Sequence, residues 1–425
     1  MCLNSPIRFL SDQGCSTLPD SAQGDFSNVA ESAIFSHSWP VSPEQKKMTI
    51  PRLLTAALLL FCIAPLSTYG QDDAKDKATE TKAADTKPEE AKDPQKEWKS
   101  LTDRRLEIAK RMKELRVLFE GSSSIDEKTR YRDEFNSLND EFGTRVLPRL
   151  RALRDTILKT NPDEPFANEM LMYEAFESNQ YPKAASHAEK VIAAGDPNAR
   201  VLSIAGVSSF AQHKFEEALK HLKSAGNQDQ MVRQYLKAAE EYVGLWKEEQ
   251  AIRKAEESSN LPRVEFDTSR GKIEMVLYED QAPNTVANFI ELIESKTYDG
   301  TKFHRVINNF MIQGGDPLSK DDNPANDGTG GPGHTIKCEC HTDAARMHFA
   351  GTLSMAHAGR DSGGSQFFIT HLPTAHLNKA HTAFGRVVKG MDVVNSVKKG
   401  DTLKTARVLS KRDHEYKAEK TESKK

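Results

Sequence analysis

The sequence predicts a multidomain protein in which an α-helical half precedes a closed antiparallel β-barrel capped by helices. Between Trp98 and Ile157, large apolar residues recur mostly at three- and four-residue spacings, which is the period of amphipathic helices. A second helical pattern then repeats after 34 residues, as stacked helix pairs do. From Val264 onward, short alternating segments are separated by glycine-rich turns, which favours many short strands.

Length and charge limit the functional classes before any motif is considered. The 425 residues are enough for two or three domains. The formal net charge of -3 gives no general attraction to nucleic acid or to an anionic membrane surface. We therefore expect no nucleic-acid partner.

Residues 48–70 have the three-part layout of a secretory signal peptide. A basic stretch at 46–52 precedes a 14-residue apolar run at 53–66, and small residues follow up to Gly70, near which we expect cleavage. The run is too short to span a bilayer comfortably, so no stable membrane span is expected. The alternative, a buried core helix, is disfavoured because a polar segment follows. These features predict an exported protein, located in a bacterial periplasm or secreted.

Three further segments are expected to lie outside any folded domain. Residues 1–47 are either an over-called start before Met48 or a long disordered leader. Residues 71–95 are mostly Lys, Asp, Glu, Ala and Thr without a large apolar side chain, which predicts a disordered linker. The charged stretch 411–425 predicts a disordered tail.

Residues 96–160 predict a helical hairpin. The apolar stripe is interrupted by Arg105, stops at Gly121 and resumes after Ser124-x-x-Glu127, a capping box that marks a helix start. A bend is expected at Pro148. The stripe is either the core between the two helices or the seam of a dimer.

Residues 161–260 predict further helices that resemble tetratricopeptide repeats. Tyr181–Ala188 matches Phe215–Leu222, and Gly206 provides a small residue where paired helices would approach closely. The resemblance implies a surface that binds a protein partner, and a plain helical bundle is the alternative. A degenerate third unit from Tyr242 to Ala255 is expected to be a capping helix pair.

The C-terminal third combines strands with one unusual polar position. Val264–Ser269 and Lys272–Tyr278 alternate like the arms of a hairpin around an Arg-Gly turn, and an amphipathic helix opens at Pro283. Phe303–Asp316 then places Arg305 among apolar residues, on segments with the two-residue period of strands. A cation in such company is unusual for a core and indicates a functional site.

Five motifs occur in order along this third of the chain: F-H-R-V-I-N-N-F-M-I-Q-G-G-D, D-G-T-G-G, L-S-M-A-H-A-G, G-S-Q-F-F-I-T and H-L-N-K-A-H-T-A-F-G. In order and spacing they resemble the motifs of the cyclophilins, the rotamases that catalyse peptidyl-prolyl cis–trans isomerisation. The resemblance covers residues 262–409 and implies an isomerase domain with the cyclophilin barrel. It implies no cofactor and no metal, and substrates that are proline-containing polypeptides.

The resemblance also implies roles for particular residues. Arg305 would donate to the proline nitrogen, most effectively away from water, and Gln313 would orient this arginine or the substrate carbonyl. The catalytic set is Arg305, Phe310, Gln313 and His381. The substrate-binding set is Met311, Gly328, Ala356, His357, Ala358, Gln366, Phe368, His376 and Leu377. Without the resemblance, the apolar members would be interpreted as core residues.

The implied function is acceleration of X-Pro isomerisation in exported proteins, with the helical half recruiting a client or a partner. The alternative is a non-catalytic chaperone or scaffold that holds proline-containing segments.

Cysteine and histidine usage leaves one question open. After the predicted processing only Cys338 and Cys340 remain, and they form either a strained disulfide or two ordinary strand positions. Eight of the 13 histidines lie in 304–381, but they lack the close paired spacing of a zinc site, so we expect no metal.

Departures from the family pattern predict weak cyclosporin binding. His376 stands where cyclosporin-sensitive members carry tryptophan, and His357 stands where many members carry asparagine. A separate departure, Asn378-Lys379-Ala380 in place of a common acidic–glycine–lysine turn, affects the expected loop shape and not the reaction. We expect proline isomerisation to continue at cyclosporin concentrations that inhibit the sensitive members. Tight, nanomolar-range inhibition in a peptide isomerisation assay would contradict this prediction.

Overall fold

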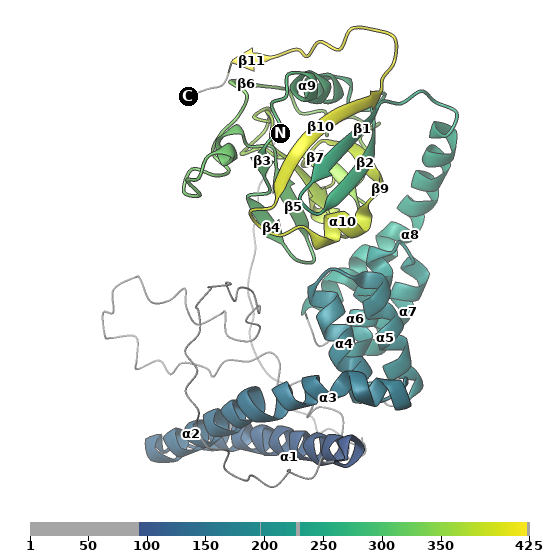
Figure 1. Ribbon diagram of the computed structural model, residues 1–425. Coiled ribbons are helices and arrows are strands. Elements are labelled where there is room, and N and C mark those ends of the chain that lie inside the picture. Colours follow the sequence, from purple (N-terminus) through teal and green to yellow (C-terminus); the bar gives the residue numbers. More distant parts are fainter. Residues whose placement is uncertain (1–92, 196, 227–229, 423–425) are drawn as a thin grey trace, which may run out of the picture.

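The computed structural model describes residues 93–195, 197–226 and 230–422, and shows a helical region followed by a domain built on one curled β-sheet (Figure 1). The predicted leader and signal peptide lie outside the described residues. Of the predicted disordered linker only the last residues are described, and Pro94 already begins the first helix. The helical region therefore starts slightly earlier than predicted.

The helical region begins with a long hairpin (Figure 1). Its elements are α1 (Pro94–Gly121), α2 (Ile125–Glu141), the π-helical turn η4 (Phe142–Val146) and α3 (Leu147–Thr160). Ser124 caps α2, because its hydroxyl accepts the backbone N–H of Glu127 at 3.4 Å. The π-helical turn lies directly before Pro148, the position of the predicted bend, where the helix loses a backbone donor.

The apolar stripe of the hairpin is an intramolecular core. Ile108 of α1 and Leu150 of α3 are fully buried in one cluster. Arg105, which interrupts the stripe, is also buried, and its guanidinium carbon lies 3.8 Å from the centroid of the Phe166 ring. An aromatic face attracts a cation, so this arginine packs the hairpin against the helix that follows.

Further helices pack against their neighbours in chain order (Figure 1). They are α4 (Pro165–Glu177), α5 (Tyr181–Ala193), α6 (Ala199–Ala211), α7 (Phe215–Ala225) and α8 (Gln230–Glu256). A Cβ atom at Gly206 would lie 2.6 Å from Cγ of Leu222, which is the close approach predicted from the repeat. The tetratricopeptide character of these helices remains a prediction. The predicted capping helix pair is wrong, because α8 is one continuous helix whose single interruption, Gly244, a helix tolerates.

The C-terminal domain is built on one curled antiparallel sheet. Across the sheet, the strands are β3 (Thr301–Lys302), β10 (Thr402–Ser410), β1 (Arg263–Thr268), β2 (Gly271–Leu277), β9 (Ala383–Lys389), β7 (Thr352–Met355), β8 (Phe367–Thr370), β5 (Met311–Gly314) and β4 (Arg305–Ile307). The predicted hairpin is present as β1 and β2. The sheet ends at β3 and β4, and no ladder joins these two strands among the described residues. The closed barrel therefore remains a prediction.

Shorter elements complete the domain. They are α9 (Pro283–Glu294), η5 (Pro317–Lys320), β6 (His334–Thr335), η6 (Ala375–Leu377), α10 (Met391–Ser396) and β11 (Thr421–Glu422). Phe289 of α9 packs edge-on against Phe384 of β9, with ring centroids 5.0 Å apart, and it also contacts Phe266 of β1 and Phe367 of β8. These rings come from separate strands, so one aromatic cluster holds the curled sheet together. Within the described ranges, no helix has both the length and the apolar content to cross a membrane.

The predicted disordered tail lies against the domain at residues 411–422 (Figure 1). Tyr416 is buried, and its hydroxyl donates to Glu279 at 2.7 Å. Arg412 donates to Asp280 through both terminal nitrogens, at 2.6 and 3.1 Å. The prediction was wrong for this stretch because it rested on overall charge. One aromatic ring and a bidentate ion pair are enough to dock a charged segment.

The helical region and the sheet domain share a buried interface along α8. Arg346, with a side chain 2% exposed, donates to Glu249 of α8 at 2.7 and 3.0 Å and also pairs with Glu256. Phe349 and Leu372 of the sheet domain are buried in the same apolar cluster as the helical residues. The two halves are therefore joined by a packed interface as well as by the chain.

We predict that Arg346→Ala destabilises the protein strongly. The substitution removes the most buried cation of a cluster in which Glu249 keeps Arg253 and Glu256 keeps Arg386. Because each carboxylate keeps one partner, we expect a loss of about 3 kcal/mol, the lower end of the ~3–5 kcal/mol that breaking a buried pair typically costs. The matched control is Arg263→Ala, which removes a half-exposed partner of Glu274 and should cost less than about 1 kcal/mol. Urea unfolding of the full chain measures both free energies of unfolding. Equal losses in the two variants would contradict the prediction.

Candidate active site

Twelve of the 13 predicted site residues line one cleft of about 710 Å³ in the sheet domain. They are Arg305, Phe310, Met311, Gln313, Gly328, Ala356, His357, Ala358, Gln366, Phe368, Leu377 and His381. His376 is exposed and does not line the cleft itself; its ring lies beside that of Phe310, with centroids 5.5 Å apart. A glycine-rich loop at 328–333 adds a further wall.

The strand register explains why polar and apolar members of the site share one face. Arg305 of β4 lies opposite Gln313 of β5, and Gln313 lies opposite Phe368 of β8. Side chains that are opposite one another on adjacent antiparallel strands point to the same face of the sheet. The sheet therefore presents an arginine, a glutamine and a phenylalanine side by side, although Phe368 is distant in the sequence.

A directed chain of hydrogen bonds orients this polar row. Gln366 Nε2 donates to the carbonyl oxygens of Gly328 and Gly330, each at 2.9 Å. Gln366 Oε1 is then left to accept from Gln313 Nε2 at 3.0 Å, and Gln313 Oε1 accepts from Arg305 Nη1 at 3.4 Å. Each amide has one donor end and one acceptor end. The two loop carbonyls therefore determine which end of Gln313 faces the arginine.

Buried Asp316 holds the loop at which this chain begins. Its carboxylate accepts the backbone N–H groups of Gly328, Gly330 at 3.2 Å and Leu318 at 2.8 Å. Gly328 has φ of +84°, and a Cβ atom there would lie 3.2 Å from the ring of His304. Glycine is therefore required at this position both by backbone conformation and by space.

The floor of the cleft is apolar. Met311 and Phe368 are 2% and 5% exposed. Phe310 and Leu377 are half-buried and line the same cleft. The site therefore combines an apolar floor with a polar row along one side.

Two stacked imidazoles form part of the rim. The rings of His381 and His357 lie 4.1 Å apart at 22°, and His381 stands edge-on to Phe368. Nδ1 of His381 lies 3.0 Å from the carbonyl oxygen of Met355 and so carries the proton, whereas Nε2 of His357 donates to Ala380 O at 2.9 Å. Partial burial lowers the pKa of His381, so this ring is neutral near pH 7 and its Nε2 is an acceptor.

Comparison with known proteins identifies the family. Residues 263–414 match the family model for cyclophilin type peptidyl-prolyl cis-trans isomerase/CLD. Peptidyl-prolyl cis-trans isomerase B of Bacillus subtilis is 52% identical over 137 residues, which cover 32% of this chain and 90% of that protein. The chain belongs to the cyclophilin-type peptidyl-prolyl cis-trans isomerases. The predicted family and enzyme class are confirmed.

Two further relatives named peptidyl-prolyl cis-trans isomerase match a similar share of this chain. The protein of Synechococcus elongatus is 46% identical over 147 residues, which cover 34% of this chain and 94% of that protein. The protein of Helicobacter pylori is 41% identical over 154 residues, covering 36% and 90% respectively. The isomerase domain of this chain thus accounts for almost all of each relative, and the helical region lies outside the matched part.

Arg305 of this cyclophilin-type isomerase is exposed, whereas a donor of this kind is expected to work best away from water. The difference follows from its position, because β4 is an edge strand with β5 as its neighbour in the sheet. The guanidinium donates to Gln313 Oε1 at 3.4 Å but stays exposed to solvent.

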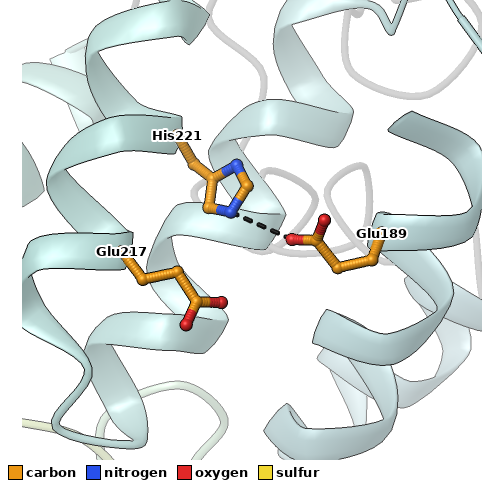
Figure 2. Close-up of side chains that lie close together, drawn as sticks. All are labelled: Glu189, Glu217 and His221. Atoms are coloured by element: carbon orange, nitrogen blue, oxygen red, sulfur yellow. Dashed lines mark ion pairs between the residues drawn. The ribbon is translucent and has the colours of Figure 1, made fainter. Parts of the chain in front are cut away.

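The described residues contain one group with the spacing to hold a metal ion, and it lies outside the isomerase cleft (Figure 2). Glu189 of α5 faces Glu217 and His221 of α7, with ligand atoms within 4.8 Å of one another. His221 Nε2 is already 3.0 Å from Glu189 Oε1, and Glu217 accepts from the hydroxyl of Ser209 at 3.1 Å. These contacts join neighbouring helices, and the isomerase cleft uses none of them.

Cys338 and Cys340 are free thiols in a loop, not on the expected strand. Cys338 Sγ accepts the backbone N–H of Asp361 at 3.1 Å, and Cys340 is 1% exposed. Burial raises the pKa of Cys338, which keeps this thiol protonated near neutral pH and lowers its reactivity.

Sequence reasoning missed a buried polar network behind the floor of the cleft. Asn378, noted above only as a departure from the family pattern, accepts the backbone N–H of His348 at 2.8 Å. The ring of His348 is fully buried and lies parallel to that of Phe368, with centroids 6.0 Å apart. The available signal was the side-chain amide of Asn378, because a buried amide needs hydrogen-bond partners. Its partners could not be identified, because they are distant in the sequence.

We predict that buried histidines make the isomerase domain acid-sensitive. Burial lowers the pKa of His348 to about 3 and that of His371 to about 4. At a pH below about 6.5, the histidine pKa in the unfolded chain, the unfolded chain binds protons that the folded chain does not. The stability contributed by these neutral rings is therefore complete above that pH and is lost as the pH falls toward 4. Each ring should contribute about 1.4 kcal/mol per pH unit.

The change in the free energy of unfolding per pH unit is measured by urea unfolding at pH values of about 6.0, 5.5 and 5.0. These values fall about midway between the unfolded and folded pKa values. The variant His371→Gln keeps a polar side chain and removes one titrating ring, so its slope should be lower by about 1.4 kcal/mol per pH unit. Parallel stability curves for the variant and the wild type would contradict the assignment.

Proposed function

We propose that this isomerase accelerates X-Pro isomerisation by using Arg305 to stabilise the twisted amide above an apolar proline seat. The observation that carries the proposal is the directed chain from Gly328 and Gly330 through Gln366 and Gln313 to Arg305. This chain of hydrogen bonds supports the proposal that the Arg305 guanidinium is already oriented before substrate binds. The guanidinium lies at the border of the apolar floor.

The reaction requires no nucleophile, metal or general base, because no covalent bond is broken. Resonance gives the peptide bond a rotation barrier of ~18–20 kcal/mol. In the twisted state the proline nitrogen becomes pyramidal and its lone pair localises. A catalyst must therefore favour the twisted state over the planar one, and a fixed donor directed at that nitrogen does so.

The proposed roles follow the shape of the cleft. Phe310, Met311, Phe368 and Leu377 would hold the proline ring, and His381 would border it. Peptide bound across the sheet edge would cover the exposed side of Arg305, which removes water at the moment when the hydrogen bond is needed. Gln366, Gly328 and the segment from Ala356 to Ala358, including His357, would grip the chain on either side of the proline.

The proposed biological role is the folding of exported proteins. The signal-peptide pattern at 48–70 supports export to a periplasm or beyond the cell. The paired helices α4–α7, with the close approach at Gly206, support a tetratricopeptide-like surface that recruits a client or partner protein.

Arg305→Ala tests the mechanism. Loss of one preorganised donor should lower kcat/KM for a proline-containing peptide by roughly 10²–10³-fold. The melting temperature should not change, because the side chain is exposed. Arg305→Lys should recover only part of the rate, because an ammonium cannot reproduce the planar guanidinium. Arg263→Ala, an arginine of β1 paired with Glu274, is the matched control and should keep the full rate.

The same variant separates the enzyme from a passive binding protein. If Arg305→Ala isomerises the peptide at the wild-type rate, the proposed mechanism is wrong. The non-catalytic chaperone or scaffold makes a different prediction. It predicts that the protein still protects an unfolded client from aggregation after Arg305→Ala.

A further inference from the structure

The turn that forms one wall of the isomerase cleft rests on a helix from outside the isomerase domain. Residues 374–381 carry Leu377 and His381 into the cleft. The turn is closed by backbone hydrogen bonds, among them those from the N–H groups of Ala380 and His381 to Leu377 O. These local bonds define the shape of the turn. Its two ends are held by the N–H of Thr374, which donates to His348 O at 3.1 Å, and by Nδ1 of His381, which donates to Met355 O of β7 at 3.0 Å.

Asn378 attaches the turn to the segment behind the cleft floor. Its Oδ1 accepts the backbone N–H of His348 at 2.8 Å and faces ring Nδ1 of the same residue at 3.2 Å. Burial lowers the pKa of His348 and keeps the ring neutral, and its Nε2 lies 2.9 Å from the hydroxyl of Ser354, which itself donates to Thr382 O at 3.0 Å. The imidazole that lies parallel to Phe368 is thereby held from both sides.

Tyr242 of α8 completes this network from the helical region. It is fully buried, and its hydroxyl donates to the carbonyl oxygen of His348 at 3.0 Å. The same hydroxyl accepts from Nδ2 of Asn378 at 3.1 Å. Burial raises the pKa of Tyr242, so the hydroxyl keeps its proton and can make both bonds. One oxygen atom thus joins the turn and the segment behind the floor.

The surroundings of Tyr242 hold its ring in place. It packs edge-on against Phe349 of the isomerase domain, with centroids 5.2 Å apart, and against Phe210 of α6 at 5.7 Å. His213 of the helical region accepts the backbone N–H of Ala350 at 3.1 Å. The Tyr242 ring therefore has little room to rotate or shift, and the position of its hydroxyl relative to Asn378 and His348 is fixed.

We infer that Tyr242 is a positioning residue of the isomerase site, supplied by the helical region. The inference rests on the enzyme class and on this network, and not on the proposed role of Arg305. Without the hydroxyl, Asn378 Nδ2 loses a buried acceptor, and the middle of the turn, which carries Leu377, is held less firmly in the cleft. The helical region is then part of the active enzyme and not only a recruiting arm.

Tyr242→Phe in the full chain tests the inference, because it removes the oxygen and keeps the ring that packs against Phe349 and Phe210. We expect a loss in kcat/KM of about three- to tenfold, the size expected when one buried hydrogen bond is lost. Hydrogen exchange of the backbone amides in 375–381 should become faster. The matched control is Tyr235→Phe. Tyr235 lies on the same helix, and its ring centroid is 5.6 Å from that of Phe210. This substitution should change neither kcat/KM nor the rate of hydrogen exchange in 375–381.

A double-mutant cycle with Asn378→Ala separates positioning from general loss of stability. If both residues act through one network, the double variant should be no slower than Asn378→Ala alone. Wild-type kcat/KM in folded Tyr242→Phe, an equal loss in Tyr235→Phe, or fully multiplied losses in the double variant would each overturn the inference. Arg305→Ala is measured in parallel, so failure of the proposed mechanism and failure of this inference give different results.

Discussion

The burial of one cation determines how the two halves of this protein are held together. A buried guanidinium needs a close counter-charge, because desolvation otherwise exceeds the electrostatic gain. For Arg346 this charge comes from Glu249 and Glu256 of α8, and the ring of Tyr278 covers the guanidinium at 3.9 Å. The ion pair holds α8 against the isomerase domain, and the same helix brings Tyr242 behind the cleft. The position of the cleft wall is therefore linked to a helix outside the catalytic fold.

The two sides of the cleft differ in what supports them. On the polar side, the isomerase domain itself orients the glutamines, since Asp316 fixes the glycine loop and the loop carbonyls orient Gln366. The opposite side, at 374–381, is joined to α8 through Asn378 and the hydroxyl of Tyr242. The turn between β4 and β5, next to Arg305, also contacts the helical region, because the backbone N–H of Asn309 donates to Asn179 at 2.7 Å and Asn308 donates to Glu177 O at 2.8 Å. The helical region therefore contacts both sides of the cleft, through the α4–α5 connection on one side and through α8 on the other.

Local patterns in the sequence predicted the parts of this structure that depend on local physics. Alternation predicted the β1–β2 hairpin, and motifs brought Arg305, Gln313 and Gln366 together before their hydrogen bonds were visible. The docked tail and the α8 interface were missed. Both depend on single complementary contacts between distant residues, such as Tyr416 with Glu279, which have no period in the sequence. The exposure of Arg305 was also missed, because the order of strands decides which one lies at an edge.

A link between α8 and the cleft must act in both directions, because coupling free energy between two sites is reciprocal. Peptide that fixes the turn at 374–381 would also favour the docked position of α8. A partner bound to the helical region can change the isomerase only if it distinguishes between positions of α8. Contact with the α1–α3 hairpin alone would bring a client near the cleft without altering it. Contact with α8 would alter the proline seat itself, so the location of a partner on the helices decides between recruitment and control.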